Sequence, residues 1–307
     1  MDNRQVVIST LDEYVREITE LYDENIHSPV KSELLYRGQY VTGLPLLPSI
    51  YRKSSETEDG EHVVTGDLLI EERNLIETTK RTLPDIFAPS LRPLELLALL
   101  QHFGIPTRLM DLSENAFVAL YFACSDRKKS FMEEADGEVI VFRHERKNDA
   151  DPPLYEAIAE SYKFADKNQT LVRFYENMVR QSYCAESRFM MMEEIKDDSA
   201  KRAFITDNSS GVNFVNTTIR SRRQYSQDGR YILFANDIDE KSEKWVGRIS
   251  EIRRDDPSIE KIIVVKKEAK EIILKHLEMF GTRKSKLFAD NVDIICEDIR
   301  ERSMIGH

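Results

Sequence analysis

The stretch QHFGIPTRLMDLS, residues 101–113, decides the fold because it lies between two apolar runs of helical character. Residues 94–100 lead into it, and residues 116–123 lead out of it. Gly104 and Pro106 end the first run, since glycine provides a left-handed helix cap and proline cannot continue a helix. The stretch also carries an imidazole, a guanidinium and a carboxylate. This density of polar groups between two core elements is typical of a binding or catalytic loop on a rigid scaffold.

Outward from this loop, the periodicity of apolar residues predicts helices and short strands in irregular alternation. Thr10 is a candidate N-cap for the first helix, and Ser113 is one for the helix after the loop. Strands scattered between helices, rather than a regular strand–helix–strand repeat, indicate an α+β fold. Helices are expected near residues 11–22, 68–83, 93–103, 115–125, 269–280 and 292–304, and strands near residues 34–37, 107–112, 137–143, 213–218, 231–235 and 259–265.

The chain shows no linker-like change in composition, so we expect a single domain. We assign residues 1–30 to an N-terminal helix, residues 31–300 to the domain itself and residues 301–307 to a tail. Residues 44–52 contain two prolines and are expected to be extended. The polar residues 144–210 are interpreted as a helical insertion that covers the core, with helices around 153–165, 168–180 and 191–203.

Composition narrows the class of protein. A net charge of −11 argues against a general nucleic-acid coat, because such binding neutralises phosphates with lysine and arginine. Three widely spaced cysteines without a CxxC pair favour neither a disulfide framework nor a zinc site. The first residues contain no apolar signal region, and no run reaches the ~20 apolar residues that cross a bilayer. We therefore expect a cytoplasmic protein without a metal site. Motifs of P-loop, Rossmann, zinc-protease and α/β-hydrolase enzymes are absent.

An arginine precedes a glycine in the upstream segment LYRGQ, residues 35–39. The guanidinium of Arg37 presents a fixed fork of donors that fits a phosphate or a carboxylate. Gly38 lets a ligand or another stretch of backbone approach closely. The alternative interpretation is that Arg37 forms a structural ion pair.

Each polar residue of the central loop has both a functional and a structural interpretation. His102 fits a general base near neutral pH, or a core histidine that backbone groups satisfy. Arg108 and Asp111 are close enough in sequence to pair with each other, and Ser113 is either a working hydroxyl or only a helix cap. Further along, the arginine-rich segment 220–229 either binds an amide or a phosphate or forms a solvated loop between two strands.

These three clusters, in this order, resemble the FRG domain family, which is named for its Phe/Tyr-Arg-Gly signature. The resemblance covers about residues 30–300, and its central motif is the most specific part. The matching segments are LYRGQ (35–39), LPSIYR (47–52), ELLALLQHFGIPTRLMDLS (95–113), VALYFA (118–123), GEVIV (137–141), QDGRY (227–231) and LFAD (287–290).

A weaker resemblance links the chain to NAD-dependent ADP-ribosyltransferases of the Arg-Ser-Glu type. It implies a central split sheet of short strands surrounded by helices, with Arg37 on an NAD phosphate and Ser113 orienting the nicotinamide ribose. The third motif of those enzymes is Glu-x-Glu before an apolar strand, whereas this chain has Gln227-Asp228-Gly229 there. The catalytic glutamate is therefore missing at its expected position. Asp111, Glu114 and Asp228 are the candidates to replace it.

The resemblance implies an NAD-dependent ADP-ribosyltransferase-like protein that acts as a bacterial toxin or in phage defence. The acceptor would be a protein or a nucleic acid, and a toxin would need a neutralising partner protein. The alternative is a catalytically silent nucleotide-binding sensor module, and a third is nucleic-acid binding by the arginines of residues 220–230. The three clusters are expected to converge around one anion held by Arg37. Candidate catalytic residues are Ser113, His102, Asp111 and Glu114, and candidate NAD-binding residues are Tyr36, Arg37, Gly38, Gln39, Gln101, Thr107, Arg108 and Gln227.

Overall fold

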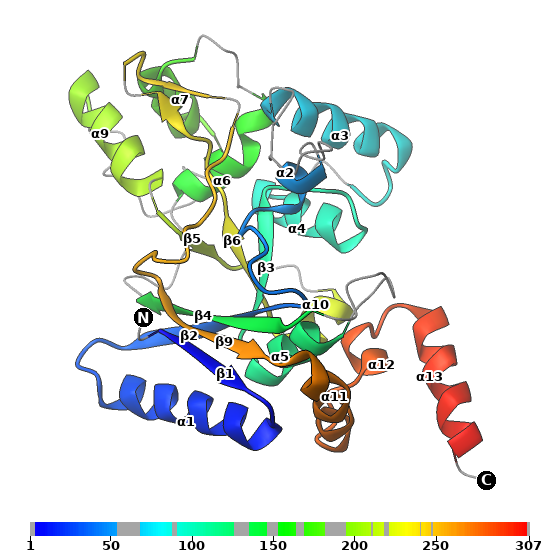
Figure 1. Ribbon diagram of the computed structural model, residues 1–307. Coiled ribbons are helices and arrows are strands. Elements are labelled where there is room, and N and C mark those ends of the chain that lie inside the picture. Colours follow the sequence, from blue (N-terminus) through cyan, green and yellow to red (C-terminus); the bar gives the residue numbers. More distant parts are fainter. Residues whose placement is uncertain are drawn as a thin grey trace.

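The computed structural model describes residues 4–53, 68–87, 91–125, 135–145, 153–163, 169–181, 195–209, 211–217, 221–239, 241–246 and 248–305. Its centre is a seven-stranded sheet in the order β1-β9-β4-β2-β3-β6-β5 (Figure 1). β1 and β9 are parallel, and the other neighbours are antiparallel. The strands are β1 (Gln5–Ile8), β2 (Ser32–Gln39), β3 (Leu109–Ser113), β4 (Gly137–Glu145), β5 (Asn213–Val215), β6 (Gly229–Leu233) and β9 (Ile259–Val265), with β7 (Ile238–Asp239) and β8 (Lys244–Trp245) as a separate pair.

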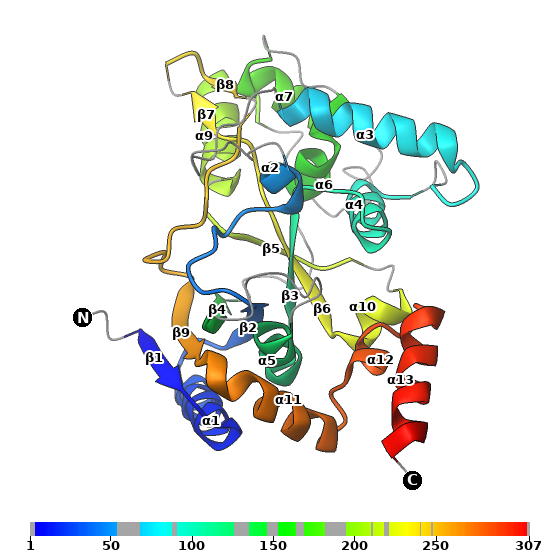
Figure 2. The ribbon, with the colours of Figure 1, turned by 45° about the vertical axis from the view of Figure 1, so that its right-hand side comes forward.

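Helices surround this sheet, so the α+β prediction is confirmed. Helices α1, α5 and α11 lie along the half of the sheet that contains β1, β9, β4 and β2, whereas α4, α6, α7 and α9 gather around the half with β3, β6 and β5 (Figures 1 and 2). The helices are α1 (Leu11–His27), α2 (Ser49–Lys53), α3 (Leu68–Thr82), α4 (Pro93–His102), α5 (Ala116–Cys124), α6 (Pro153–Glu160), α7 (Leu171–Val179), α9 (Asp198–Ser209), α10 (Arg222–Ser226), α11 (Lys270–Met279), α12 (Lys284–Leu287) and α13 (Val292–Ile305), with short 3-10 turns η1 (Ser161–Lys163) and η3 (Lys267–Ala269).

The two halves of the sheet are joined by very little backbone pairing. β2 pairs with β4 along its whole length, from Ser32 to Gln39, but it pairs with β3 only through Tyr36 and Ser113. Figure 1 shows β3 and β6 running steeply across the direction of β2 and β4. We call the junction at the Tyr36–Ser113 pair the seam.

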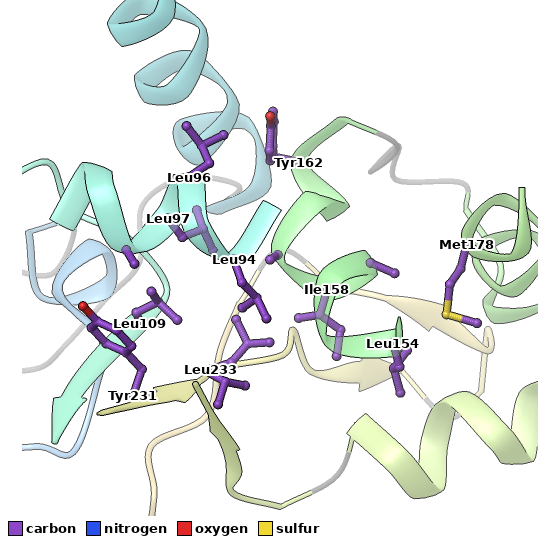
Figure 3. Packing of buried hydrophobic residues seen from close by; sticks show 14 of the residues in the cluster. Leu94, Leu96, Leu97, Leu109, Leu154, Ile158, Tyr162, Met178, Tyr231 and Leu233 are labelled. Atoms are coloured by element: carbon purple, nitrogen blue, oxygen red, sulfur yellow. The ribbon is translucent and has the colours of Figure 1, made fainter. Parts of the chain in front are cut away.

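Three apolar cores hold these layers together. The first lies beneath α4, α6 and α7 (Figure 3), the second lies between α1, α5, α11 and the sheet, and the third fills the angle between the two halves of the sheet. Burial of apolar surface is the main force that holds such layers in place, and it contributes about 25 cal/mol for each Å² removed from water. Representative members are Leu97, Leu154 and Leu233 in the first core, Tyr14, Val118 and Ile273 in the second, and Leu35, Met110 and Ile232 in the third.

The starts of two helices show how local sequence sets the fold. Thr10 caps α1 as predicted, since its side chain accepts the N–H of Glu13 and the Glu13 carboxylate binds back to the Thr10 N–H. The prediction for α5 was wrong by two residues. Its N-cap is Asn115, whose side chain accepts the N–H of Phe117 at 3.0 Å, whereas Ser113 ends β3.

Several expected boundaries differ in the structure. The first residues contain strand β1 before the helix, because residues 5–8 pair in parallel with the edge of β9 and bury Ile8. Helix α2 follows Pro48 within a stretch expected to be extended, and α10 occupies part of the expected loop 220–229. Of the expected tail, residues 301–305 belong to α13. In the insertion, α6, α7 and α9 lie near the predicted helices, while Arg220 and Cys184 lie outside the described residues.

The two described cysteines should differ sharply in reactivity. Cys124 in α5 is buried, and desolvation raises the pKa of its thiol to about 12, whereas Cys296 in α13 is exposed. Because the thiolate is the reactive form, we expect iodoacetamide near pH ~8 to alkylate Cys296 in the folded protein and Cys124 only after unfolding. Peptide mass spectrometry reports each position separately. Alkylation of Cys124 in the native protein would contradict the packing of α5.

Candidate functional site

Arg37 bridges the two halves of the sheet at the seam. Alternate residues of a strand share a face, so Arg37 lies on the same face as Leu35, toward the core between the two halves. Its Nη1 donates to the main-chain oxygen of Asp111 on β3 at 2.7 Å. This bond continues the link between β2 and β3 beyond their single backbone pair. The alternative interpretation of Arg37 was a structural ion pair. This contact is not one, because the acceptor is a main-chain carbonyl.

Two carboxylates lie around a second arginine on the same face. Glu114 accepts a bond from Nε of Arg230, whose Nη2 is 3.5 Å from Oε1 of Glu33. The side chain of Arg230 is only 11% exposed, whereas that of Glu114 is 41% exposed. Register explains the grouping, since Arg230 of β6 pairs with Leu112 of β3, two residues before Glu114. A solvent-accessible carboxylate is thus held by a nearly buried guanidinium beside the seam.

An imidazole completes this group. Nδ1 of His144 lies 3.7 Å from Oε2 of Glu33, its partner across β2 and β4. The His144 ring stacks on Phe214 with 4.6 Å between the ring centres. Glu33 and His144 were not among the predicted site residues. Glu33 lies two residues before Leu35 of β2, and His144 lies two residues after Phe142 of β4. Each therefore shares the core-facing side of its strand with a core residue.

A second polar group lies at the end of α4. Thr107 donates through Oγ1 to Oε1 of Gln101 at 2.5 Å, and Gln101 donates through Nε2 to Oδ1 of Asp111 at 2.7 Å. Asp111 is exposed between the buried residues Met110 and Leu112 of β3, so its side chain lies on the opposite face of the strand from theirs. The predicted pairing of Asp111 with Arg108 is wrong, because Asp111 binds an amide instead.

His102 is held by side chains from two distant segments. Its Nε2 lies 3.1 Å from Oδ2 of Asp290, and its Nδ1 lies 3.1 Å from Oγ of Ser221. The interpretation as a core histidine satisfied by backbone is therefore wrong. Ser221 and Asp290 were not among the candidate residues, although Asp290 lies in the LFAD segment that resembles the FRG family.

Ser113 and Gln227 stabilise the turn that precedes β6. The Ser113 hydroxyl donates to the main-chain oxygen of Gln227 at 2.7 Å and accepts the N–H of Asn115 at 3.0 Å. The Gln227 side chain donates to the carbonyl of Leu287 at 2.9 Å. Asp228 has a φ of 46° and accepts from the Asn115 amide at 3.3 Å. Both side chains proposed to contact NAD from this region are thus engaged in internal bonds.

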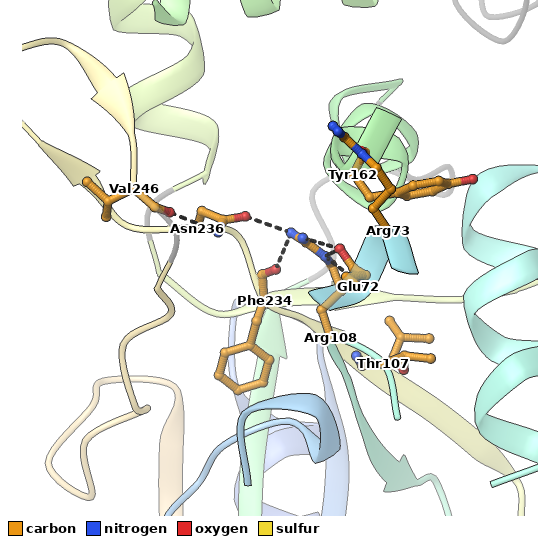
Figure 4. A network of polar contacts seen from close by, with 9 residues as sticks. Glu72, Arg73, Thr107, Arg108, Tyr162, Phe234, Asn236 and Val246 are labelled. Carbon is orange, nitrogen blue, oxygen red and sulfur yellow. Dashed lines mark hydrogen bonds and ion pairs between the residues drawn. The ribbon is translucent and has the colours of Figure 1, made fainter. Parts of the chain in front are cut away.

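Arg108 is part of the protein interior (Figure 4). Its side chain is fully buried and binds the carboxylate of Glu72 through Nε and Nη2, with distances of 2.9 and 2.5 Å. Nη1 donates to Oδ1 of Asn236 at 3.0 Å and to the carbonyl of Phe234 at 3.3 Å. A guanidinium with all three nitrogens engaged in the interior cannot bind NAD, so this prediction is corrected.

Three further candidates are also structural. Tyr36 is buried in the core beneath α5, and burial raises the pKa of its hydroxyl to about 12. A Cβ on Gly38 would lie 1.9 Å from the carbonyl oxygen of Ala119, so the close neighbour of this glycine is helix α5 and not a ligand. Gln39 is buried and donates to the carbonyl of Leu44 and to Glu138.

The predicted single anion site is therefore not formed. Arg37 and Glu114 lie at the seam on the core-facing side, whereas Gln101, His102 and Asp111 lie on the other side of β3. A cavity of about 770 Å³ borders α9, β6 and the loop around Arg248, and no predicted site residue lines it. Within the described ranges, no helix is long and apolar enough to cross a membrane, and no three His, Cys, Asp or Glu side chains group as metal ligands would.

The seam and the end of α4 fall within one stretch of the chain that matches a family model. Residues 32–131 match the family model of the FRG domain. The chain contains an FRG domain. The matched range holds β2, α4, β3 and α5, which are the elements that bring Arg37, His102 and Asp111 into position. β6, α10 and Asp290 lie outside the matched range. The searches of curated proteins and of solved structures find no match to this chain.

Proposed function

We propose that this protein binds NAD at the seam and transfers its ADP-ribose, in the role of a bacterial toxin or a phage-defence enzyme. One observation carries the proposal. Arg37 of β2 and Glu114, which follows β3, flank the single Tyr36–Ser113 pair and lie on the same side of the sheet. Sequence resemblance to ADP-ribosyltransferases of the Arg-Ser-Glu type supports the same assignment for Arg37.

The charges at the seam suit the two ends of such a reaction. Arg37 would bind the diphosphate of NAD, because a guanidinium forms strong paired bonds with phosphate oxygens. Glu114 would stabilise the positive charge that develops on the ribose as nicotinamide leaves, which is an electrostatic role. Arg230 holds the Glu114 carboxylate in one position. In this proposal Glu114 replaces the catalytic glutamate that is missing from the segment Gln227-Asp228-Gly229.

Substitution of Arg37 tests the binding step. We expect Arg37→Ala to weaken NAD binding about 10- to 100-fold, the usual value of a charge-assisted hydrogen bond, in calorimetric titrations. Arg253→Ala removes an exposed arginine of the pair Arg253–Asp255 and serves as the matched control with unchanged affinity. Because Arg37 also links β2 to β3, thermal unfolding of both variants must show that they are folded. Equal affinity of Arg37→Ala and the wild type would contradict the proposal.

Substitution of Glu114 separates binding from turnover. We expect Glu114→Gln to bind NAD normally and to release nicotinamide about 100-fold more slowly or worse, as for the loss of one electrostatic stabiliser. Chromatography of the incubated protein with NAD and a cell lysate measures the release. Absence of release by the wild type would favour the second candidate below.

The second candidate is a silent nucleotide-binding sensor module. It is favoured by the position of Gln227, whose amide binds the Leu287 carbonyl, and by the engagement of the Ser113 hydroxyl in an internal bond. If the protein is such a sensor, it should bind NAD or a related nucleotide, and the ligand should be recovered intact after incubation. Arg37→Ala again loses binding, but Glu114→Gln changes nothing measurable.

A further inference from the structure

We propose that Ser221, His102 and Asp290 form a hydrolytic triad for carboxylic esters, separate from the seam. Three segments far apart in the sequence supply the three side chains, with 3.1 Å between Ser221 Oγ and His102 Nδ1 and 3.1 Å between His102 Nε2 and Asp290 Oδ2. A short sequence motif cannot predict this arrangement, because the three residues lie in separate segments of the chain.

The direction of the hydrogen bonds follows from the chemistry of the groups. An ionised carboxylate only accepts hydrogen bonds, so Asp290 fixes the proton of His102 on Nε2. Nδ1 is then the acceptor, and the Ser221 hydroxyl donates to it. With the proton on Nε2, Nδ1 can take a proton from the serine while the carboxylate stabilises the resulting imidazolium, so the two ring nitrogens exchange the roles they have in serine proteases.

Neighbouring contacts hold the serine and the aspartate in place. Ser221 is the N-cap of α10, and its Oγ accepts the N–H of Gln224 at 3.1 Å while its own proton remains available to His102. The end of α10 is held to the segment before Asp290, since the Gln227 amide donates to the carbonyl of Leu287 at 2.9 Å. The side chains of His102 and Asp290 are 19% and 27% exposed, so a substrate can reach them.

A positive charge beside the triad indicates the substrate class. The guanidinium of Arg223, two residues after Ser221, lies 5.0 Å from the ring centre of Phe288, two residues before Asp290. It would attract an anionic group of the substrate. We therefore assign esters that carry a second, acidic group.

The reaction follows from these roles. Ser221 Oγ attacks the ester carbonyl carbon while its proton passes to His102 Nδ1. The carbon–oxygen bond to the alcohol breaks, and the alcohol leaves with that proton. Water then attacks the acyl-serine with His102 as base, which releases the carboxylic acid and restores the Ser221 hydroxyl.

Labelling with a fluorophosphonate probe tests the triad in the full chain. The Ser221 oxygen would bond to phosphorus as fluoride leaves, and mass spectrometry would place the adduct on Ser221. Ser221→Asn keeps a good helix cap and should abolish labelling, while Thr19→Ala, which removes an exposed hydroxyl from α1, should label like the wild type. Probe bound elsewhere, or no adduct on Ser221, overturns the proposal.

Hydrolysis of 4-nitrophenyl esters supplies the second readout. We expect His102→Gln and Asp290→Asn to lower the rate about 100-fold or more, the usual contribution of a positioned acid–base group. The half-ester of succinic acid should be hydrolysed faster than the acetate, and Arg223→Ala should remove that preference. Equal rates for Asp290→Asn and the wild type would also overturn the proposal, provided that both variants unfold at the wild-type temperature.

Discussion

Replacing Arg108 by alanine is expected to lower the free energy of unfolding by about 3–5 kcal/mol, the usual result of removing one partner of a buried ion pair. The side chains of Arg108 and Glu72 are 0% and 1% exposed, so the substitution leaves a carboxylate in the interior without its cation. It also removes the hydrogen bonds that Arg108 donates to Oδ1 of Asn236 and to the carbonyl of Phe234. Urea denaturation followed by circular dichroism measures the change.

Two comparisons show whether burial is the cause. Arg253→Ala breaks an ion pair whose side chains are 80% and 58% exposed, so its midpoint should match the wild type because surface pairs contribute little. The double variant Glu72→Met with Arg108→Met should recover much of the lost stability, since apolar replacement of a whole buried pair is often tolerated. A midpoint for Arg108→Ala equal to that of Arg253→Ala would mean that Arg108 is not buried as described.

Sequence patterns predicted elements well wherever a local signal was strong. Thr10 and Glu13 formed the expected capping box, and the apolar runs on both sides of residues 101–113 became α4 and α5. Patterns failed where the signal was short. Four residues suffice for β1 only because β9 provides an edge for them, and that edge lies more than 250 residues away in the chain.

Partners of polar residues could not be predicted, because a local pattern indicates which face a side chain occupies and not what lies opposite it. Arg108 pairs with Glu72, 36 residues away, rather than with the nearby Asp111. His102 meets Ser221 at a separation of 119 residues. Sequence placed the polar residues of 101–113 between the elements that became α4 and α5, but their division between the two faces of β3 depends on how the sheet folds at the seam.

Substitution of Gly38 by alanine should be the most damaging small change in the FRG domain. The added Cβ would lie 1.9 Å from the carbonyl oxygen of Ala119 and 2.8 Å from the main-chain nitrogen of Ala123, so helix α5 must move away from β2. Neither neighbour is a flexible side chain, and forced overpacking of this kind costs about 3 kcal/mol or more. Since α5 also packs on β3, its displacement would disturb the seam.

Gly43→Ala is the matched control. Gly43 has a φ of 77° with open space around it, so its substitution introduces backbone strain of about 1 kcal/mol and no clash. Gly137, where a Cβ would lie 2.1 Å from the carbonyl oxygen of Ala123, should behave like Gly38 because it contacts the same helix. Thermal unfolding measures the melting temperature of each of the three variants. We expect the melting temperatures of Gly38→Ala and Gly137→Ala to be far below that of Gly43→Ala. If Gly38→Ala melts at the same temperature as Gly43→Ala, α5 does not lie directly against β2 and the position assigned to Arg37 on the opposite face loses its basis.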